Sequence, residues 1–208
     1  YPSPFEEAAI LTADGTGEWA TSSIAYGKGK EITALKEMHF PDSLGLLYST
    51  FTAFLGFRVN SGEYKLMGLA PYGNPQSGDY KAFTARIREE LLDIFPDGSI
   101  RMNPAYFSYT AGHHMFSAKS WNNLWGFPAR KTSEKIEQKH CDLALAIQHI
   151  TEDILLKMTV HAKEITGSKY LCMAGGVALN CVANEKIRNS GLFNDIFIQL
   201  AAGDAGGS

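Results

Sequence analysis

Three glycine-rich turns hold the residues best suited to chemistry, and each turn follows a short apolar run. The turns read ADGTGEW at 13–19, AGGVALN at 174–180 and AAGDAGG at 201–207. Glycine has no Cβ atom, so another group can come close to its backbone. Exposed N–H groups at such turns favour an anion such as phosphate. For the pair Gly175 and Gly176, an ordinary strand-to-helix turn explains the pattern equally well.

Two of these turns also contain an acid, Asp14 in the first and Asp204 in the third. Paired carboxylates beside glycine-rich turns suit a divalent cation or the metal of a bound nucleotide. Each acid also has a purely structural interpretation. Asp14 can open an Asp-Gly turn, and Asp204 can cap the helix that follows it. We expect the two carboxylates to lie close enough for one cation to touch both.

The elements that must position these turns are predicted from hydrophobic periodicity and turn residues. Asp42 or Ser43 is a candidate cap for the first helix, and Val177, Leu179, Val182, Ala183 and Ile187 would share a face of the last one. The expected elements are a strand at 6–13, a hairpin at 17–40 that turns at GKGK, a helix at 42–56, a helix at 133–167, a strand at 170–174, a helix at 177–191 and a strand at 195–201.

Three meandering strands followed by alternating helices and strands are typical of an RNase H-like lobe. We therefore predict an α/β fold with a mixed sheet of about five strands and helices on both faces. The first strand should lie in the middle, antiparallel to the second and parallel to the last two. Ligands collect at the carboxyl ends of parallel strands, so all three glycine turns should lie along one edge.

The stretch 57–132 loses this periodicity and is predicted to be an irregular, α-rich insertion outside the sheet. It contains the loop GEYKLMGLAPYGNP, an amphipathic helix at 79–95 and a group of aromatic residues that favours a core over a sugar-binding surface. Residues 1–56 and 133–208 would form the core of a single lobe. The chain starts without Met and stops inside a glycine-rich turn, so we expect a fragment of a longer protein.

Composition excludes several classes of function. The 208 residues are 45% hydrophobic and carry a formal net charge of −3, which gives no general attraction to nucleic acid or to an anionic membrane. No apolar run is long enough to span a bilayer, and no signal peptide is visible. Cys141, Cys172 and Cys181 lack metal-binding spacing and are predicted to be reduced core residues of a cytoplasmic protein.

Four segments resemble the signature segments of the O-carbamoyltransferase family, which includes enzymes of nodulation-factor and antibiotic carbamoylation. They are ILTADGTGEWATSS, GEYKLMGLAPYG, LCMAGGVALNCVANEKI and AAGDAGG. The resemblance covers nearly the whole chain and is weakest in the aromatic insertion. Family members contain a domain similar to the universal tRNA threonylcarbamoyl-transfer protein, with two RNase H-like lobes as in actin and sugar kinases. This chain resembles the second lobe.

The resemblance implies a reaction in two stages. A separate adenylating domain makes carbamoyl adenylate from carbamoyl phosphate and ATP, and the two-lobed domain moves the carbamoyl group to a hydroxyl of a sugar or natural product. A metal, often iron, would be held by Asp14, Asp204 and a histidine pair upstream of this chain. The implied nucleotide contacts, with Asn180 holding the adenylate, are Gly15, Thr16, Gly17, Gly175, Gly176, Asn180, Gly203 and Gly206.

Lys65, in EYKLMG, could neutralise phosphate charge or could be a solvated surface lysine. The chain lacks the upstream histidine motif, the first lobe and the adenylating domain, so the fragment alone should be inactive and its metal site incomplete. His113 and His114 are interpreted as a surface pair, and His149 and His161 as ordinary helix residues. The sequence does not single out a catalytic residue.

Two rival functions share the glycine turns. A nucleotide-driven conformational switch of the actin or chaperone class has no use for GEYKLMGLAPYG. A metal-dependent nuclease on the same fold needs several carboxylates around two cations and a basic face, so it ranks last for this mildly acidic chain. The product formed from ATP, carbamoyl phosphate and a hydroxyl acceptor would separate the three functions.

Overall fold

The computed structural model describes residues 3–17, 19–110, 112 and 114–203. By their contacts, the described residues form two compact units. Unit 1 draws on Tyr1–Leu46, Phe95–Ile100 and Glu152–Ser208, and unit 2 on Leu47–Ile94 and Arg101–Thr151. The boundary between the units falls inside two helices, α1 (Leu44–Phe54) and α5 (Gln138–Thr166). The prediction of a single lobe with an insertion at 57–132 stays a prediction.

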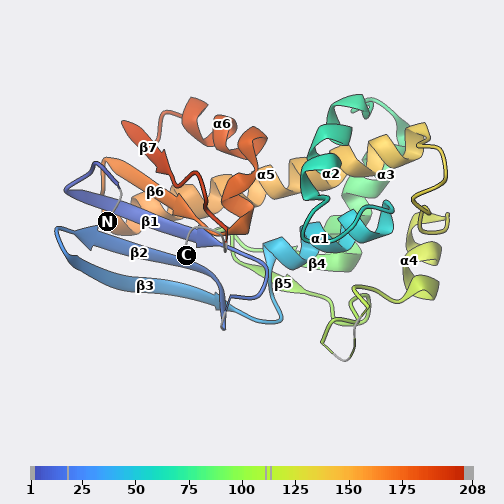
Figure 1. Cartoon of the computed structure of the whole chain (residues 1–208), viewed down its shortest axis with the longest axis horizontal. Coiled ribbons are helices and arrows are strands. Elements are labelled where there is room, and N and C mark those ends of the chain that lie inside the picture. Colours follow the sequence, from blue (N-terminus) through green and yellow to red (C-terminus); the bar gives the residue numbers. More distant parts are fainter. Residues whose placement is uncertain (1–2, 18, 111, 113, 204–208) are drawn as a thin grey trace. The chain divides into compact units, whose positions relative to one another are not determined.

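Unit 1 contains a five-stranded sheet in the order β3-β2-β1-β6-β7, which can be followed in Figure 1. β1 lies in the middle, antiparallel to β2 and parallel to β6, and β7 is parallel to β6. The predicted mixed sheet and its strand order are therefore confirmed. The strands are β1 (Glu7–Ala13), β2 (Ala20–Lys28), β3 (Glu31–His39), β6 (Tyr170–Ala174) and β7 (Asp195–Ile198).

Side-chain alternation defines the buried face of the sheet. Leu11 of β1 is opposite Ile24 of β2 and Met173 of β6, and all three are buried. Their neighbours Ile10 and Thr12, which point to the other face, are only half-buried. The carboxyl-terminal half of α5 lies against the buried face, and an ion pair of 3.3 Å between Lys186 and Glu152 joins α6 (Cys181–Asn189) to α5. Coverage of both faces by helices stays a prediction.

The helix after β6 begins later than the sequence pattern predicts. Residues Gly176–Leu179 form a short 3-10 helix, η3, and α6 starts only at Cys181. The Asn180 side chain caps α6 by accepting the N–H of Ala183, which separates the two helical segments. Leu179 and Val182 are consequently exposed, whereas Ala183 and Ile187 are buried. The prediction of one shared apolar face over 177–191 is therefore wrong for Leu179 and Val182.

Unit 2 is mainly helical and has an aromatic core. Trp121 is fully buried, with its ring centroid 5.0 Å from that of Phe51 and 5.3 Å from that of Phe54. Its indole N–H donates to the Tyr106 carbonyl at 2.8 Å. The aromatic residues near Trp121 therefore form a core, as the sequence favours. The helices of this unit include α2 (Glu63–Leu69), η1 (Ala70–Tyr72), α3 (Gly78–Arg86), the π-helical turn η2 (Ile87–Leu91) and α4 (Ala118–Trp125).

A separate two-stranded sheet joins β4 (Leu92–Ile94) to β5 (Ile100–Met102). The helix predicted at 79–95 is therefore wrong at its end, because the chain passes through the π-helical turn and becomes extended at Leu92. Of the described residues between 57 and 132, none joins the five-stranded sheet. α5 starts at Gln138, later than predicted, and leaves Ile136 exposed, while Gly167 ends it with a φ of +64°.

No helix within the described part of the chain is long and apolar enough to cross a membrane. The three cysteines, all of them described, form no disulfide. Cys141 is buried, as predicted, and Cys172 is half-buried. Cys181 is exposed, so its prediction as a core residue is wrong. It is the first residue of α6.

The cysteines should therefore differ in reactivity. Burial raises the pKa of the Cys141 thiol, so this residue is both inaccessible and poor in thiolate. We predict that iodoacetamide labels Cys181 first and Cys141 last in the folded protein, with rates at least about tenfold apart. Peptide mass spectrometry over a time course measures both rates, and labelling in urea serves as the control. Equal rates in the folded protein would contradict the assigned burial.

Candidate functional site

The turn after β1 is fixed by hydrogen bonds to the Thr21 carbonyl, to the Asp14 carboxylate and from the Ser43 hydroxyl. The Asp14 N–H donates to the Thr21 carbonyl at 2.8 Å, and the Asp14 carboxylate accepts the Gly15 N–H at 2.8 Å. The hydroxyl of Ser43 lies 3.0 Å from the Asp14 carbonyl oxygen and 2.5 Å from that of Gly15. The same hydroxyl accepts the Leu46 N–H at 3.0 Å, so Ser43, one of the two predicted caps, holds α1 against this turn.

The turn after β6 comes into direct backbone contact with β1. Gly175 is buried and has a φ of +94°, and a Cβ atom at this position would overlap the carbonyl oxygen of Ala13 and lie 2.7 Å from its carbon. Glycine is therefore required at 175 by the protein's own main chain. Contact between a nucleotide and Gly175 stays a prediction.

The turn after β7 completes the cluster. The Gly175 N–H donates to the Ala202 carbonyl at 2.8 Å. A Cβ atom on Gly203 would lie 3.9 Å from the Leu179 side chain, which follows β6. A Cβ atom on Gly176 would lie 3.1 Å from Oδ1 of the Asp14 carboxylate, so these two residues face each other. The prediction that Gly15, Gly176 and Gly203 share one edge of the sheet is confirmed.

Parts of this edge are open to an approaching group. A Cβ atom on Gly15 would meet nothing within 4 Å, and Gly176 is exposed with only the Asp14 carboxylate near its Cβ position, among the described residues. Thr16 and Gly17 are also exposed. Asn180 is buried and bonded to the start of α6. Binding roles for these residues remain predictions, and Asp204 and Gly206 lie outside the described residues.

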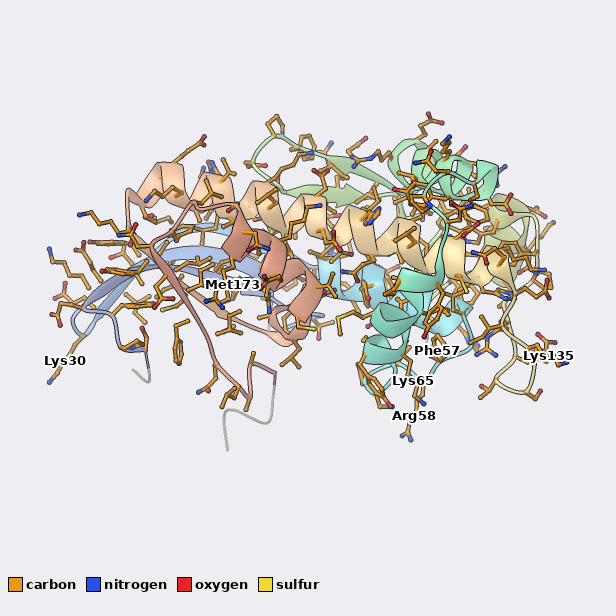
Figure 2. The ribbon with its side chains drawn as sticks, turned by 90° about the horizontal axis from the view of Figure 1, so that it is seen from above. Lys30, Phe57, Arg58, Lys65, Lys135 and Met173 are labelled. Atoms are coloured by element: carbon orange, nitrogen blue, oxygen red, sulfur yellow. The ribbon has the colours of Figure 1, made fainter. Side chains whose placement is uncertain are left out.

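Lys65 belongs to unit 2, where it is an exposed residue of α2. Its ammonium group lies 5.8 Å from the ring centroid of Tyr64, which is also exposed. Figure 2 shows Lys65 and Arg58 projecting toward the same side of the view. The arrangement gives unit 2 an exposed cationic and aromatic surface, and a contact between Lys65 and phosphate stays a prediction.

Asp142 fixes the loop that follows η1 and was not found from the sequence. Its carboxylate is buried and accepts the Asn74 N–H at 2.7 Å, the Ser77 hydroxyl at 2.8 Å and the Gln138 amide at 2.8 Å. The signal available in the sequence is an acid at the start of the apolar run LALAI within a helix. The segment APYGNPQS is thus hydrogen-bonded to the first turns of α5 within unit 2.

The described residues supply only one of the predicted metal ligands, Asp14. No group of three His, Cys, Asp or Glu side chains in the described ranges could hold a metal ion. His114 is exposed, and His149 accepts or donates a 2.8 Å hydrogen bond with the Tyr80 hydroxyl. A single carboxylate does not fix a transition metal, so these residues do not by themselves fit the iron site that the resemblance implies.

Comparison with known proteins gives a consistent result. The family model described as carbamoyltransferase N-terminus matches residues 1–208. An uncharacterized Synechocystis protein, sll1178, is 50% identical over the whole chain, which covers 33% of that protein. Nodulation protein NolNO of Sinorhizobium fredii is 38% identical over 98% of the chain, and the match covers 27% of the length of NolNO. Nodulation protein NolO of Bradyrhizobium diazoefficiens is 35% identical over 98% of the chain, and the match covers 34% of the length of NolO. The chain thus spans about a third of these relatives.

The contact between Gly175 and Ala13 gives a stability prediction with a matched control. Gly191 also has a positive φ, +68°, but a Cβ atom there would meet none of the described residues within 4 Å. Alanine should cost about 1 kcal/mol at Gly191 for its backbone conformation alone. At Gly175 we expect a loss of at least about 3 kcal/mol, because overlap with the Ala13 carbonyl is added. Urea unfolding measures both losses, and equal values would contradict the close approach of β1 and β6.

Proposed function

We propose, from the premise that this chain belongs to the carbamoyltransferase family, that it forms part of an ATP-dependent enzyme that transfers carbamoyl groups to hydroxyl acceptors. The chain would contribute one lobe of the transfer domain. The single observation that supports this most directly is the gathering of three glycine-rich turns and Asp14 at one edge of the sheet. The strand order β3-β2-β1-β6-β7 suits an RNase H-like lobe.

The proposed ligand at this edge is carbamoyl adenylate. Among the described residues nothing lies within 4 Å of a Cβ position on Gly15, so an adenylate phosphate would approach the main chain there, as phosphate-binding turns require. The carboxylate of Asp14 already accepts the Gly15 N–H, which fixes the orientation of this acid beside Gly176. Its negative charge would repel a bare phosphate, so its proposed role is to orient the carbamoyl NH₂ or the acceptor hydroxyl by accepting a hydrogen bond.

The proposed transfer step balances as an acyl transfer. The acceptor oxygen forms a bond to the carbamoyl carbon, the bond from that carbon to the phosphate oxygen breaks, and AMP leaves with the bonding electrons. The hydroxyl proton passes to a base or to solvent. Positioning of the two reactants accounts for much of the rate in such reactions. No step is assigned to a metal, because Asp14 is the only candidate ligand among the described residues.

The test of this proposal uses the natural full-length protein. It is mixed with carbamoyl phosphate, ATP and a panel of hydroxyl-bearing sugars, and mass spectrometry detects an acceptor that has gained one carbamoyl group together with AMP. Carbamoylated product supports the proposal. Nucleotide binding without any such product over the panel would contradict it and favour a nucleotide-driven switch.

Asp14→Asn tests the site, and Asp195→Asn is its matched control. Each carboxylate accepts the N–H of the next residue at 2.8 Å, but Asp195 starts β7 and so lies at the opposite edge of the sheet. We predict that Asp14→Asn lowers kcat/KM at least about tenfold through lost hydrogen bonding to reactants, whereas Asp195→Asn changes it by less than about twofold. Equal effects of the two substitutions would remove Asp14 from the site.

A further inference from the structure

A hollow in unit 2 lies between the end of α3, the π-helical turn η2, the loop after β5 and helix α4. Its volume is about 580 Å³, which is within the range of small-molecule sites. The glycine turns belong to unit 1, so the hollow is a separate feature. Most of the side chains that line it are polar, and two of them, Arg86 and Glu90, carry opposite charges.

Glu90 is held in the hollow by Tyr106. The Tyr106 hydroxyl donates to Oε2 of Glu90 at 2.6 Å, and this bond raises the pKa of the phenol, so the donor stays protonated at neutral pH. The Asn103 amide fixes the same loop by donating to the Glu90 carbonyl at 2.8 Å. Oε1 of Glu90 accepts no hydrogen bond from a described residue, and Glu90 is exposed, so this oxygen can meet a ligand.

Arg86 supplies the positive charge. It is the last residue of α3, four positions before Glu90, so the two side chains lie on the same face of the helical segment. Arg86 is half-buried and forms no ion pair with any described residue. The order of the pair contributes to this, because an acid placed four residues before a base pairs better than the reverse. The hollow therefore holds one cation and one anion that do not pair with each other.

These charges discriminate between classes of small ligand. A simple anion that met Arg86 would also meet the negative charge of Glu90, and a simple cation would meet Arg86. A neutral ligand would desolvate both charges without supplying an opposite charge to either. A zwitterion supplies both, and a free α-amino acid carries its carboxylate and its ammonium group on the same carbon atom. Side chains four residues apart on a helix have Cβ atoms about 5–6 Å apart, which suits charges so closely spaced.

We propose that this hollow binds a free α-amino acid in its zwitterionic form. The planar guanidinium of Arg86 would donate two hydrogen bonds to the carboxylate, and Oε1 of Glu90 would accept one from the ammonium group. The Asn123 amide, which is exposed on α4 and makes no side-chain hydrogen bond to a described residue, offers another acceptor. Ala105 and Leu124 are the apolar part of the lining and would contact an aliphatic side chain.

The probe is L-leucine, compared with two analogues that each lack one charge. In 4-methylpentanoate the ammonium group is missing, and in 3-methylbutylamine the carboxylate is missing. Isothermal titration calorimetry uses the natural full-length protein at about pH 7, where both groups of the amino acid are charged. It should give a Kd at or below about 1 mM for L-leucine, which is within reach of roughly nine non-hydrogen atoms. Each analogue should bind at least about tenfold more weakly. No saturable binding of L-leucine, or equal affinity for either analogue, would overturn the proposal.

Two substitutions locate the site, and two neighbouring residues serve as controls. Arg86→Gln and Glu90→Gln each remove one charge but keep polar atoms, and each should weaken L-leucine binding about tenfold. Arg88→Gln and Glu89→Gln are the controls, because these residues lie between the pair in the chain but do not line the hollow. They should change the Kd less than about twofold. Circular dichroism establishes folding of each variant. Unchanged binding in folded Arg86→Gln and Glu90→Gln would refute the assignment.

Discussion

The close approach of β1 and β6 is the constraint on which the candidate site depends. The two strands are parallel neighbours, and the main chain of Ala13 occupies the space that a side chain at Gly175 would need. Asp14 and Gly176, which follow these two contacting residues in the chain, face each other at the edge of the sheet. The N–H of Gly175 then holds the turn after β7 through Ala202. One glycine thus joins three turns.

A second set of contacts fixes the turn after β1. Ser43 bonds both to the carbonyl groups of Asp14 and Gly15 and to the first turn of α1. Gly45 allows that helix to lie directly on the turn, since a Cβ atom at 45 would come within 2.6 Å of the Asp14 carbonyl carbon. The orientation of Asp14 is therefore set by residues about 30 positions away. Such preorganisation is what catalysis by positioning requires.

The sheet could be predicted from sequence because its signals are local. Apolar alternation, a GKGK turn and glycines after apolar runs mark the strands and turns, and the strand order then follows from the RNase H-like plan that this succession of elements is typical of. Features that depend on distant partners could not be predicted in this way. Asn180 divides one expected helix into two segments by capping α6, Leu92 leaves a helical pattern to form a strand, and Asp142 bonds to a loop about 65 residues earlier in the chain.

Binding of the adenylate at the glycine edge is tested most directly by observing glycine amides. The natural full-length protein is labelled with ¹⁵N-glycine and titrated with ATP, and amide chemical shifts are followed. We predict that Gly15 and Gly176 respond, while Gly167, which precedes β6 at the opposite edge, and Gly191, which follows α6, do not. Saturable shifts at Gly167 or Gly191 without any at Gly15 and Gly176 would contradict it.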